Sequence, residues 1–559
     1  MEGNWNRIFF LMFFSFVCHT SLWAQQDTLF YRIQFTDKNN TPFIIQQPTS
    51  FLSQKAIARR EKSGIPIKTQ DLPIDPNYIT QVLSYASVNY ITHSKWFNQL
   101  VVVSNDTNDI NAIQLLPFVA NTKQFVKPID KFPIADKKLS ISSPKESIVV
   151  NPHYPYGITY AQNHLHHLDF MHDLAFNGQG IDIAVIDSGF DNAIDLEGIK
   201  HLFANGQILS TYDFVDREES VTEDHFHGSA VLSVMAGFIE GEFYGSSTLA
   251  NFHLLRSEDA NAEYIIEEDF WVCAAEYADS AGCDIINTSL GYSTFDDSTQ
   301  NHTYADLDGN TTLIARASDI ASSKGILCVT SAGNLGNSDW GYISTPADAD
   351  STLTIGAIDQ YNQIAPFSSY GPSADGDIKP NLVSVGWLTQ LIAPWDNAII
   401  QGNGTSFSAP MVSGLAACLW QALPELNNME LKSLLETTAS QANLPDTLRG
   451  FGYPRVFEAY SSQSGITYQS PSHLEIMSVF PNPVATSQAL SLKVASNLDT
   501  EAEVLLINVL GQVTYRHTIS LNTGVNMITI RGDLRNAKGV YSIILQNENE
   551  FTQERLIFQ

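Results

Sequence analysis

The stretch that constrains this chain most is the glycine-rich segment 402–410, Gly-Asn-Gly-Thr-Ser-Phe-Ser-Ala-Pro. It is followed at 411–420 by small and apolar residues without a charge, which predict a buried helix. Pro410 suits the first turn of that helix, where a missing N–H costs little. Ser406 is then expected at or just before the helix N-terminus, where free N–H groups favour negative charge. There the serine is either a helix cap or a nucleophile whose oxyanion a backbone N–H stabilises.

Length and charge limit what the whole chain can be. Its 559 residues are too many for one core, so roughly three or four domains are expected. The apolar content of 44% and the charged content of 16% are typical of folded domains. The 60 acids face only 30 bases, a formal net charge of −30. Such a surface repels nucleic acid and anionic membranes, so neither is an expected partner.

The N-terminus is typical of an export signal. Arg7 precedes an apolar run at 8–17, and small residues lead to Ala24, so residues 1–24 are predicted to be a cleaved signal peptide. The run is too short to span a bilayer comfortably. A lipoprotein anchored at Cys18 is a weaker alternative, because the preceding Val17 is bulky. Cleavage would leave four cysteines, which an exported chain can hold either as disulfides or as buried thiols: Cys273, Cys283, Cys328 and Cys418.

Three apolar runs in the middle of the chain end in polar, glycine-containing tips. These runs predict buried parallel strands, and polar residues at the carboxyl ends of such strands lie where open α/β sheets place their sites. Taken singly, the acid at the first tip could cap a turn and the asparagine at the third could be a turn residue. The tips are Asp187-Ser188-Gly189, Asn287-Thr288-Ser289-Leu290-Gly291 and Ser331-Ala332-Gly333-Asn334.

A histidine opens a helix of small residues between the first two tips. His227 is followed by Gly228 and Ser229, and a lone histidine in such a place is more often structural than functional. His225 and His227 could also bind a metal, but two ligands at this spacing are weak evidence for one.

Together these motifs resemble those of the subtilisin-like serine peptidases (the subtilase, or S8, family), in the order Asp, His, Ser. The resemblance extends from 153 to 461 and implies an α/β fold of three layers, a parallel sheet with helices on both faces. It implies that Ser406 attacks the peptide carbonyl, that His227 takes and returns the proton, and that Asp187 orients the imidazole. Asn334 and the Ser406 N–H would stabilise the oxyanion. No cofactor is required.

The same resemblance implies a substrate edge. Ser289, Leu290 and Gly291 are expected to pair with an extended peptide. The residues before Asn334 are expected to line the substrate site as well, namely Ser331, Ala332 and Gly333. The chain departs from the family at Ser229-Ala230, where a threonine and a second histidine are usual, and at 379–386, where an acid and a proline are missing.

Metal binding is left open. The segment 306–310, Asp-Leu-Asp-Gly-Asn, has the alternating oxygen ligands of a calcium loop but lacks the later glutamate, so a solvated turn is favoured. A histidine cluster before the core is expected to be a surface helix rather than a zinc site. Its members are His164, His166, His167 and His172.

Two further domains are expected around the core. Residues 25–130 read as a small α+β module, and 131–152, rich in Lys, Ser and Pro, as a linker. The module is either an independent binding domain or a cleavable prosegment that folds on the peptidase and inhibits it. Its position between signal and core favours the prosegment, with the maturation cut in the exposed linker.

The carboxyl-terminal part reads as short alternating strands with glycine turns. After a linker at 462–474, residues 475–559 predict an antiparallel β-sandwich without a chemical constellation. Pro481-Asn482-Pro483 and the segments 508–512 and 538–541 resemble the sorting domain of the type IX secretion system. This implies transport by that machinery across the outer membrane of a Bacteroidota-type cell, then release or surface attachment. A carbohydrate- or protein-binding sandwich is the alternative.

The sequence thus predicts a secreted serine endopeptidase that acts on proteins or peptides. The competing hypothesis is a non-catalytic adhesin or binding protein on a peptidase-like fold. An α/β-hydrolase esterase is disfavoured, because no Gly-x-Ser-x-Gly elbow precedes the helix.

Overall fold

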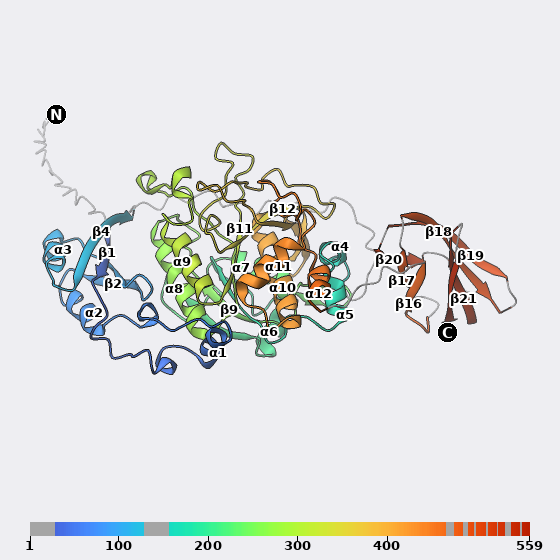
Figure 1. Cartoon of the computed structure of the whole chain (residues 1–559), viewed down its shortest axis with the longest axis horizontal. Helices are drawn as coiled ribbons and strands as arrows, with labels where there is room; N and C mark the ends of the chain where they lie inside the picture. The colour runs from blue at the N-terminus through green and yellow to red at the C-terminus, as the bar shows by residue number, and fades with distance from the viewer. Residues whose placement is uncertain are drawn as a thin grey trace, which may run out of the picture.

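Three parts lie in a row in the elongated molecule of Figure 1. The computed structural model describes residues 28–127, 156–464 and 474–558, with short gaps in the last part at 485–489, 497–498, 510–511, 523, 531–537 and 548–550. The expected signal peptide (1–24) and the linker at 131–152 lie outside the described residues, as does most of 462–474. In the described parts of the chain no helix is long and apolar enough to cross a membrane.

The first part is the expected α+β module. Its elements are β1 (Thr28–Phe35), α1 (Gln54–Lys62), α2 (Pro76–Val82), β2 (Asn89–Ser94), β3 (Gln99–Val103), α3 (Thr107–Gln114) and β4 (Val119–Lys127), with short 3-10 helices at Pro48–Ser50 and Thr69–Asp71. The strands form an antiparallel sheet in the order β2-β3-β1-β4.

The two faces of this small sheet have different partners. Alternate residues of a strand point to opposite faces, and in β1 Tyr31 and Ile33 pack on α2 and α3. Phe30 points the other way, into a cluster with Ile266 and Phe270 of the middle part. The sheet is therefore covered on both sides, and the middle part supplies one of the covers.

The middle part is built on a parallel sheet of seven strands. They are β5 (Asp182–Asp187), β6 (Ile208–Asp213), β9 (Asn251–Arg256), β10 (Ile285–Thr288), β11 (Leu327–Ser331), β12 (Leu353–Ile358) and β13 (Leu382–Val385), in the order β13-β12-β11-β10-β5-β9-β6. Every pair is parallel.

Helices cover both faces of this sheet, as expected. In β5, Ile183 and Val185 face a core shared with α7 (His227–Ala236) and α10 (Thr405–Ala422). Ala184 and Ile186 face a second core shared with α8 (Ile266–Ala281) and α9 (Leu313–Ser323). Apart from the edge strand β6, these strands are buried almost throughout, which explains their largely apolar sequences.

Smaller elements complete the middle part. They are α4 (Tyr160–His164), α5 (Leu168–Asp173), α6 (Lys200–Ala204), α11 (Asn428–Thr437), α12 (Val456–Ser464), the strand pairs β7 (Phe238–Ile239) with β8 (Phe243–Tyr244) and β14 (Thr389–Ile392) with β15 (Ile399–Gly402), and 3-10 helices at Ser298–Gln300 and Tyr304–Asp306. Because α12 ends at Ser464, it reaches into the segment expected as a linker.

The last part is an antiparallel sandwich, as expected. One sheet has the order β16-β17-β20 and the other β19-β18-β21-β22, with a shared core between them. The strands are β16 (Glu475–Phe480), β17 (Leu490–Ser496), β18 (Thr500–Asn508), β19 (Val513–Leu521), β20 (Gly524–Ile530), β21 (Gly539–Gln546) and β22 (Phe551–Phe558). β19 and β22 were not anticipated, because both are edge strands whose side chains are largely polar and exposed.

The four cysteines that remain after the expected signal cleavage are unbridged. Cys273, Cys283, Cys328 and Cys418 are all buried free thiols. Burial raises the pKa of Cys328 to about 11, so this thiol stays protonated and unreactive at neutral pH.

Candidate active site

The acid and the histidine singled out in the sequence meet at the carboxyl edge of the large sheet. Asp187 is the last residue of β5 and is 1% exposed, and His227 is the first residue of α7. The Nδ1 of His227 lies 2.7 Å from Oδ1 of Asp187. A carboxylate at this distance holds the proton on Nδ1, which leaves Nε2 as the nitrogen that can accept another proton.

The turn after Asp187 holds its carboxylate in place. The backbone N–H of Ser188 donates to Asp187 Oδ1 at 2.8 Å, and the Ser188 hydroxyl lies 2.6 Å from Nδ1 of His225. Gly189 has φ +143°, and a Cβ there would come within 2.7 Å of the His225 backbone nitrogen. The glycine thus lets two loops touch. The Nδ1 atoms of His225 and His227 each face another protein group.

Ser406 lies in the first turn of α10, but not for the reason expected. The prediction that Pro410 opens this helix is wrong, because α10 begins at Thr405 and Pro410 lies inside it. In a regular helix the N–H of residue 410 would bond to the carbonyl of Ser406, and proline has no N–H. The Ser289 hydroxyl supplies the missing donor, at 2.9 Å from that carbonyl. Without this contact a buried carbonyl would lack its partner.

Ser406 and Ser289 are joined a second time. The Ser406 hydroxyl donates to the Ser289 carbonyl at 3.2 Å. Behind them, Asn287 donates to the Ser289 hydroxyl at 3.1 Å and accepts from Ser413 at 2.8 Å. The nucleophile candidate is therefore held to the tip of β10 by a chain of buried polar side chains.

Asn334 is oriented by the residue before the serine. Its Oδ1 accepts from the Thr405 N–H at 2.8 Å and from the Thr405 hydroxyl at 3.1 Å. Asn334 is exposed, and these two contacts fix the orientation of its amide group. Its Nδ2 lies on the side of Gly404, 3.6 Å from the point where a Cβ on that glycine would be. Thr405 is a functional candidate that the sequence analysis did not single out, although its place beside Ser406 was the available signal.

The residues expected to bind substrate lie on two neighbouring strand ends. Ser289, Leu290 and Gly291 follow β10, and the 331–333 segment follows β11, its direct neighbour in the sheet. Both main-chain groups of Ala332 are used within the protein, by Ile355 and Ser344. The N–H of Gly333 donates to the Thr405 hydroxyl, and its carbonyl accepts from the Ser369 N–H. The N–H groups of Ala332 and Gly333 are therefore not available to a peptide backbone, while both residues can contribute a wall to a substrate site.

Two groups of three aspartates converge in the described parts of the chain. Asp213, Asp216 and Asp224 converge, but the cation between them is the guanidinium of Arg256, at 2.5 to 3.3 Å. In the calcium-like loop at 306–310, the carboxylate of Asp308 accepts from the Asn310 and Thr311 backbones of its own turn. A further exposed group consists of Asp350, Asp375 and Asp377. Asp350 lies beside Gly309 of the calcium-like loop, and Asp375 accepts a hydrogen bond from the Ser373 hydroxyl at 2.5 Å.

The histidine cluster does not converge on one point. His166 is fully buried between the Pro454 carbonyl and Ser384, which corrects the expectation that the whole cluster lies on a surface helix. His172 contacts Tyr156 and the Ser246 carbonyl. His166 and His172 therefore have separate partners within the protein.

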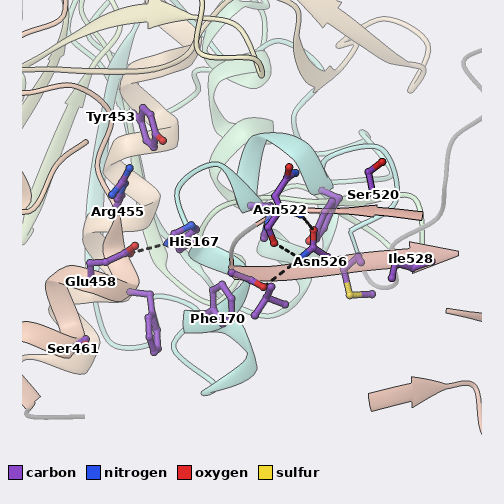
Figure 2. A pocket seen from close by; sticks show the side chains of 16 residues that line it. His167, Phe170, Tyr453, Arg455, Glu458, Ser461, Ser520, Asn522, Asn526 and Ile528 are labelled. Carbon is purple, nitrogen blue, oxygen red and sulfur yellow. Dashed lines mark hydrogen bonds and ion pairs between the residues drawn. The ribbon is translucent and has the colours of Figure 1, made fainter. Parts of the chain in front are cut away.

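A cavity of about 890 Å³ lies away from Ser406, between the middle part and the sandwich. Figure 2 shows His167, in its 2.8 Å contact with Glu458, on one side and β-strand residues such as Asn526 and Ile528 on the other. It contains none of the candidate catalytic residues, so the chemistry predicted from the sequence does not lie there.

Comparisons with known proteins agree with the three-part division. Residues 178–453 match the Subtilase family, residues 30–141 the Bacteroidota Peptidase S8 propeptide domain, and residues 478–559 the secretion system C-terminal sorting domain.

Curated relatives are bacterial proteases. A thermophilic serine proteinase of Bacillus sp. (strain AK1) is 28% identical over 352 residues, which cover 63% of this chain and 77% of the relative. Alkaline elastase YaB of Bacillus sp. (strain YaB) is 25% identical, covering 64% and 78%. Subtilisin BL of Lederbergia lenta is 27% identical, covering 51% and 91%. The chain is thus built around a subtilase-family (peptidase S8) domain, with a Bacteroidota S8 propeptide domain before it and a secretion-system sorting domain after it.

Proposed function

We propose that this protein is a secreted serine endopeptidase that cleaves peptide bonds through an Asp187, His227 and Ser406 triad and an acyl-enzyme intermediate. The observation that carries the proposal is the 2.7 Å contact between Asp187 and His227 at the sheet edge where the helix bearing Ser406 begins. A carboxylate, an imidazole and a helix-start hydroxyl are the groups that nucleophilic acyl transfer needs.

In the first step the Ser406 oxygen forms a bond to the peptide carbonyl carbon while its proton passes to Nε2 of His227. For this transfer the hydroxyl must leave its hydrogen bond to the Ser289 carbonyl. The imidazolium is then stabilised by Asp187, and it returns the proton to the leaving amine as the C–N bond breaks. Water repeats the sequence and releases the acyl group.

The carbonyl oxygen that becomes negative needs donors fixed in advance. We assign this role to the Asn334 amide, which Thr405 orients, and to the Ser406 backbone N–H at the start of α10. An extended substrate would pair with 289–291, where glycine at 291 leaves room for a second backbone.

The two flanking domains would control the inhibition and the export of the precursor. The 25–130 segment would act as an intramolecular inhibitor until the chain is cut within 131–152. The sorting domain would direct transport by the type IX secretion machinery after export through a signal peptide at 1–24, which would place the mature enzyme outside the cell or on its surface.

Labelling with a fluorophosphonate tests the proposal. Matured protein should be labelled and should cleave an internally quenched peptide blocked at both ends, which only an endopeptidase can cut. Ser406→Ala should lose both activities. Ser408→Ala is the matched control, because this buried hydroxyl lies two residues further along the same helix and donates to the Thr405 carbonyl. An unlabelled matured protein would instead favour the non-catalytic binding protein.

A further inference from the structure

One segment of the prosegment leaves its own sheet and lies on the subtilase domain. Residues 36–75, here called the arm, connect β1 to α2 and include α1, which Figure 1 places beside the lower end of α8. Its hydrogen bonds to this domain lie at the ends of α8 and α9 and just before the starts of strands, whereas the candidate active site lies at the opposite ends of those strands.

The arm caps the last turn of α8. Helix ends leave carbonyls without partners, and here Ser53 supplies them: its N–H donates to the Ser280 carbonyl at 2.8 Å and its hydroxyl to the Ala281 carbonyl at 2.7 Å. Gly282, with φ +100°, ends the helix, and a Cβ there would come within 2.8 Å of Ser53 and Ala56. The glycine is thus needed both for its conformation and for the approach of the arm.

Three cations of the arm meet carboxylates of the subtilase domain. Lys55 lies 2.8 Å from Asp182 and 2.7 Å from Asp284, the acids at the amino ends of β5 and β10. Arg59 and Arg60 both bind Asp279, at 2.6 and 2.7 Å. The Asp279 side chain is fully buried and those of the two arginines are 5% and 1% exposed. Removing one partner of such a pair while the arm stays bound leaves an uncompensated buried charge, which is strongly unfavourable.

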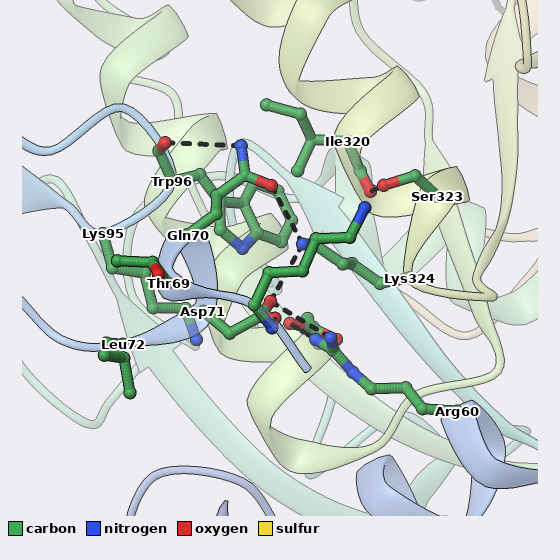
Figure 3. A network of polar contacts seen from close by, with 12 residues as sticks. Arg60, Thr69, Gln70, Asp71, Leu72, Lys95, Trp96, Ile320, Ser323 and Lys324 are labelled. Carbon is green, nitrogen blue, oxygen red and sulfur yellow. Dashed lines mark hydrogen bonds and ion pairs between the residues drawn. The ribbon is translucent and has the colours of Figure 1, made fainter. Parts of the chain in front are cut away.

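The charges also pair in the opposite sense, as Figure 3 shows. Asp71 of the arm lies 2.9 Å from Lys324 at the end of α9 and 3.1 Å from Arg60. Lys324 also donates to Gln70 at 2.9 Å. With acids and bases on both sides, the surfaces fit in one register, so a merely cationic segment would not replace the arm.

We propose that this surface of the subtilase domain, formed by Asp182, Asp279, Asp284 and Lys324, is a second prosegment-binding site whose occupant is the arm. It lies one strand length, about 16 Å, from Asp187, since β5 starts at Asp182 and rises about 3.3 Å per residue. It holds the prosegment after the chain is cut within 131–152, whether or not the active-site cleft is occupied. Only the existence of a natural cut rests on the proposed function.

The test removes that dependence. The full chain with Ser406→Ala receives two recognition sites for an added protease, at 131 and 152, so that cutting excises the linker and needs no activity of its own. The prosegment should stay bound during gel filtration, and its dissociation rate can be followed by dilution with a fluorescent label on the prosegment. Release immediately after the cut would overturn retention.

Substitutions test the site itself. Arg59→Met with Arg60→Met should raise the dissociation rate at least 100-fold. The matched control is Lys62→Met on the same helix, which removes a charge whose contact is the face of Trp420 at 5.8 Å; less than a fivefold effect is expected. If the double variant does not fold, Lys55→Met, whose side chain is 36% exposed, provides a milder loss, with about a tenfold faster release. An unchanged rate in the variants that fold would refute the second site.

Discussion

Strand β5 begins and ends with an aspartate, and the two residues have opposite surroundings. Asp182, at the amino end, faces the Lys55 ammonium of the prosegment and the amide of Asn251. Asp187, at the carboxyl end, faces an imidazole and the N–H and hydroxyl of Ser188. One acid is paired with a cation that another segment brings, while the other contacts only groups of its own domain.

Buried charges thus have two roles in this molecule: some join the prosegment to the subtilase domain, and others orient side chains within that domain. At the amino end, pairs such as Arg60 with Asp279 join two segments that can part. At the carboxyl end, the contact of Asp187 with His227 is retained whatever happens to the prosegment, because both residues belong to the subtilase domain. Substitutions at the two ends should therefore affect different measurements.

The largest effect is expected from exchanging the two aspartates for asparagine. Asp187→Asn should lower kcat/KM by about 10⁴-fold, because the amide no longer fixes the imidazole tautomer; this order of magnitude is the general one for triad aspartates. Asp182→Asn should leave kcat/KM within about threefold. Both are measured on protein matured by an added protease. Equal losses of kcat/KM in the two variants would show that the two ends of β5 do not differ in function.

Asp279→Ala should mainly weaken the precursor. Two arginines lose their buried partner, so the free energy of unfolding of the precursor should fall by about 3–5 kcal/mol. Urea unfolding of the Ser406→Ala chain measures the loss. Asp173→Ala, which removes the exposed partner of Lys493 in the sandwich, is the control and should change little. Activity of the matured variant should be normal, and a lower kcat would contradict the separation of the ends.

Ser289→Ala should have a smaller effect at the carboxyl ends of the strands, where Ser289 donates to the Ser406 carbonyl. The Ser406 carbonyl would be left without a donor, since Pro410 has none to offer, at a cost of about 1–3 kcal/mol in stability. The catalytic rate should fall with it. Ser289→Thr keeps a hydroxyl and should restore most of the loss, as judged by thermal unfolding and peptide hydrolysis. A silent Ser289→Ala would mean that this hydrogen bond does not support the nucleophile.

The smallest effect concerns pH. His302 lies in the loop that follows β10, and its Nε2 is 2.6 Å from Oε1 of Glu268. Burial lowers the pKa of His302, but the hydrogen bond to Glu268 and the negative charge of Glu268 outweigh burial and raise the pKa above 6.5. A raised pKa in the folded state means that the contribution to stability is complete below pH 6.5 and is lost as pH rises through the folded pKa. Between pH 6 and 8.5 the wild type should lose about 1 °C more in Tm than His302→Gln. Burial lowers the pKa of Lys55, but its carboxylates outweigh burial and raise it, so Lys55 should stay charged over this range and its contacts with Asp182 and Asp284 should not respond.

Much of the site could be predicted because each strand carries its own signal. The apolar run of β5 and the acid that ends it are neighbours in sequence, and burial of the run places the acid at the sheet edge. The same holds for 327–334 and for the tip at 287–291.

What could not be predicted depends on distant partners. α8 carries Asp269, Glu276 and Asp279, and a single helix with such acids is expected to turn them to solvent. Instead they face the prosegment: Asp269 binds Arg32 at 2.6 Å, and Glu276 accepts from Ser94 at 2.5 Å. No local pattern shows that residues 170 or more positions earlier will cover this helix face. The start of α10 was missed for a related reason, because the donor that makes Pro410 acceptable inside a helix comes from β10.

The double link between Ser289 and Ser406 has a consequence for selectivity. The residue that opens the substrate edge is also the one that positions the carbonyl and hydroxyl of the nucleophile. A peptide that fits the edge badly would shift Ser289, and the attacking oxygen would move with it. Peptides that fit the edge well and peptides that fit it badly would then differ more in kcat than in binding affinity.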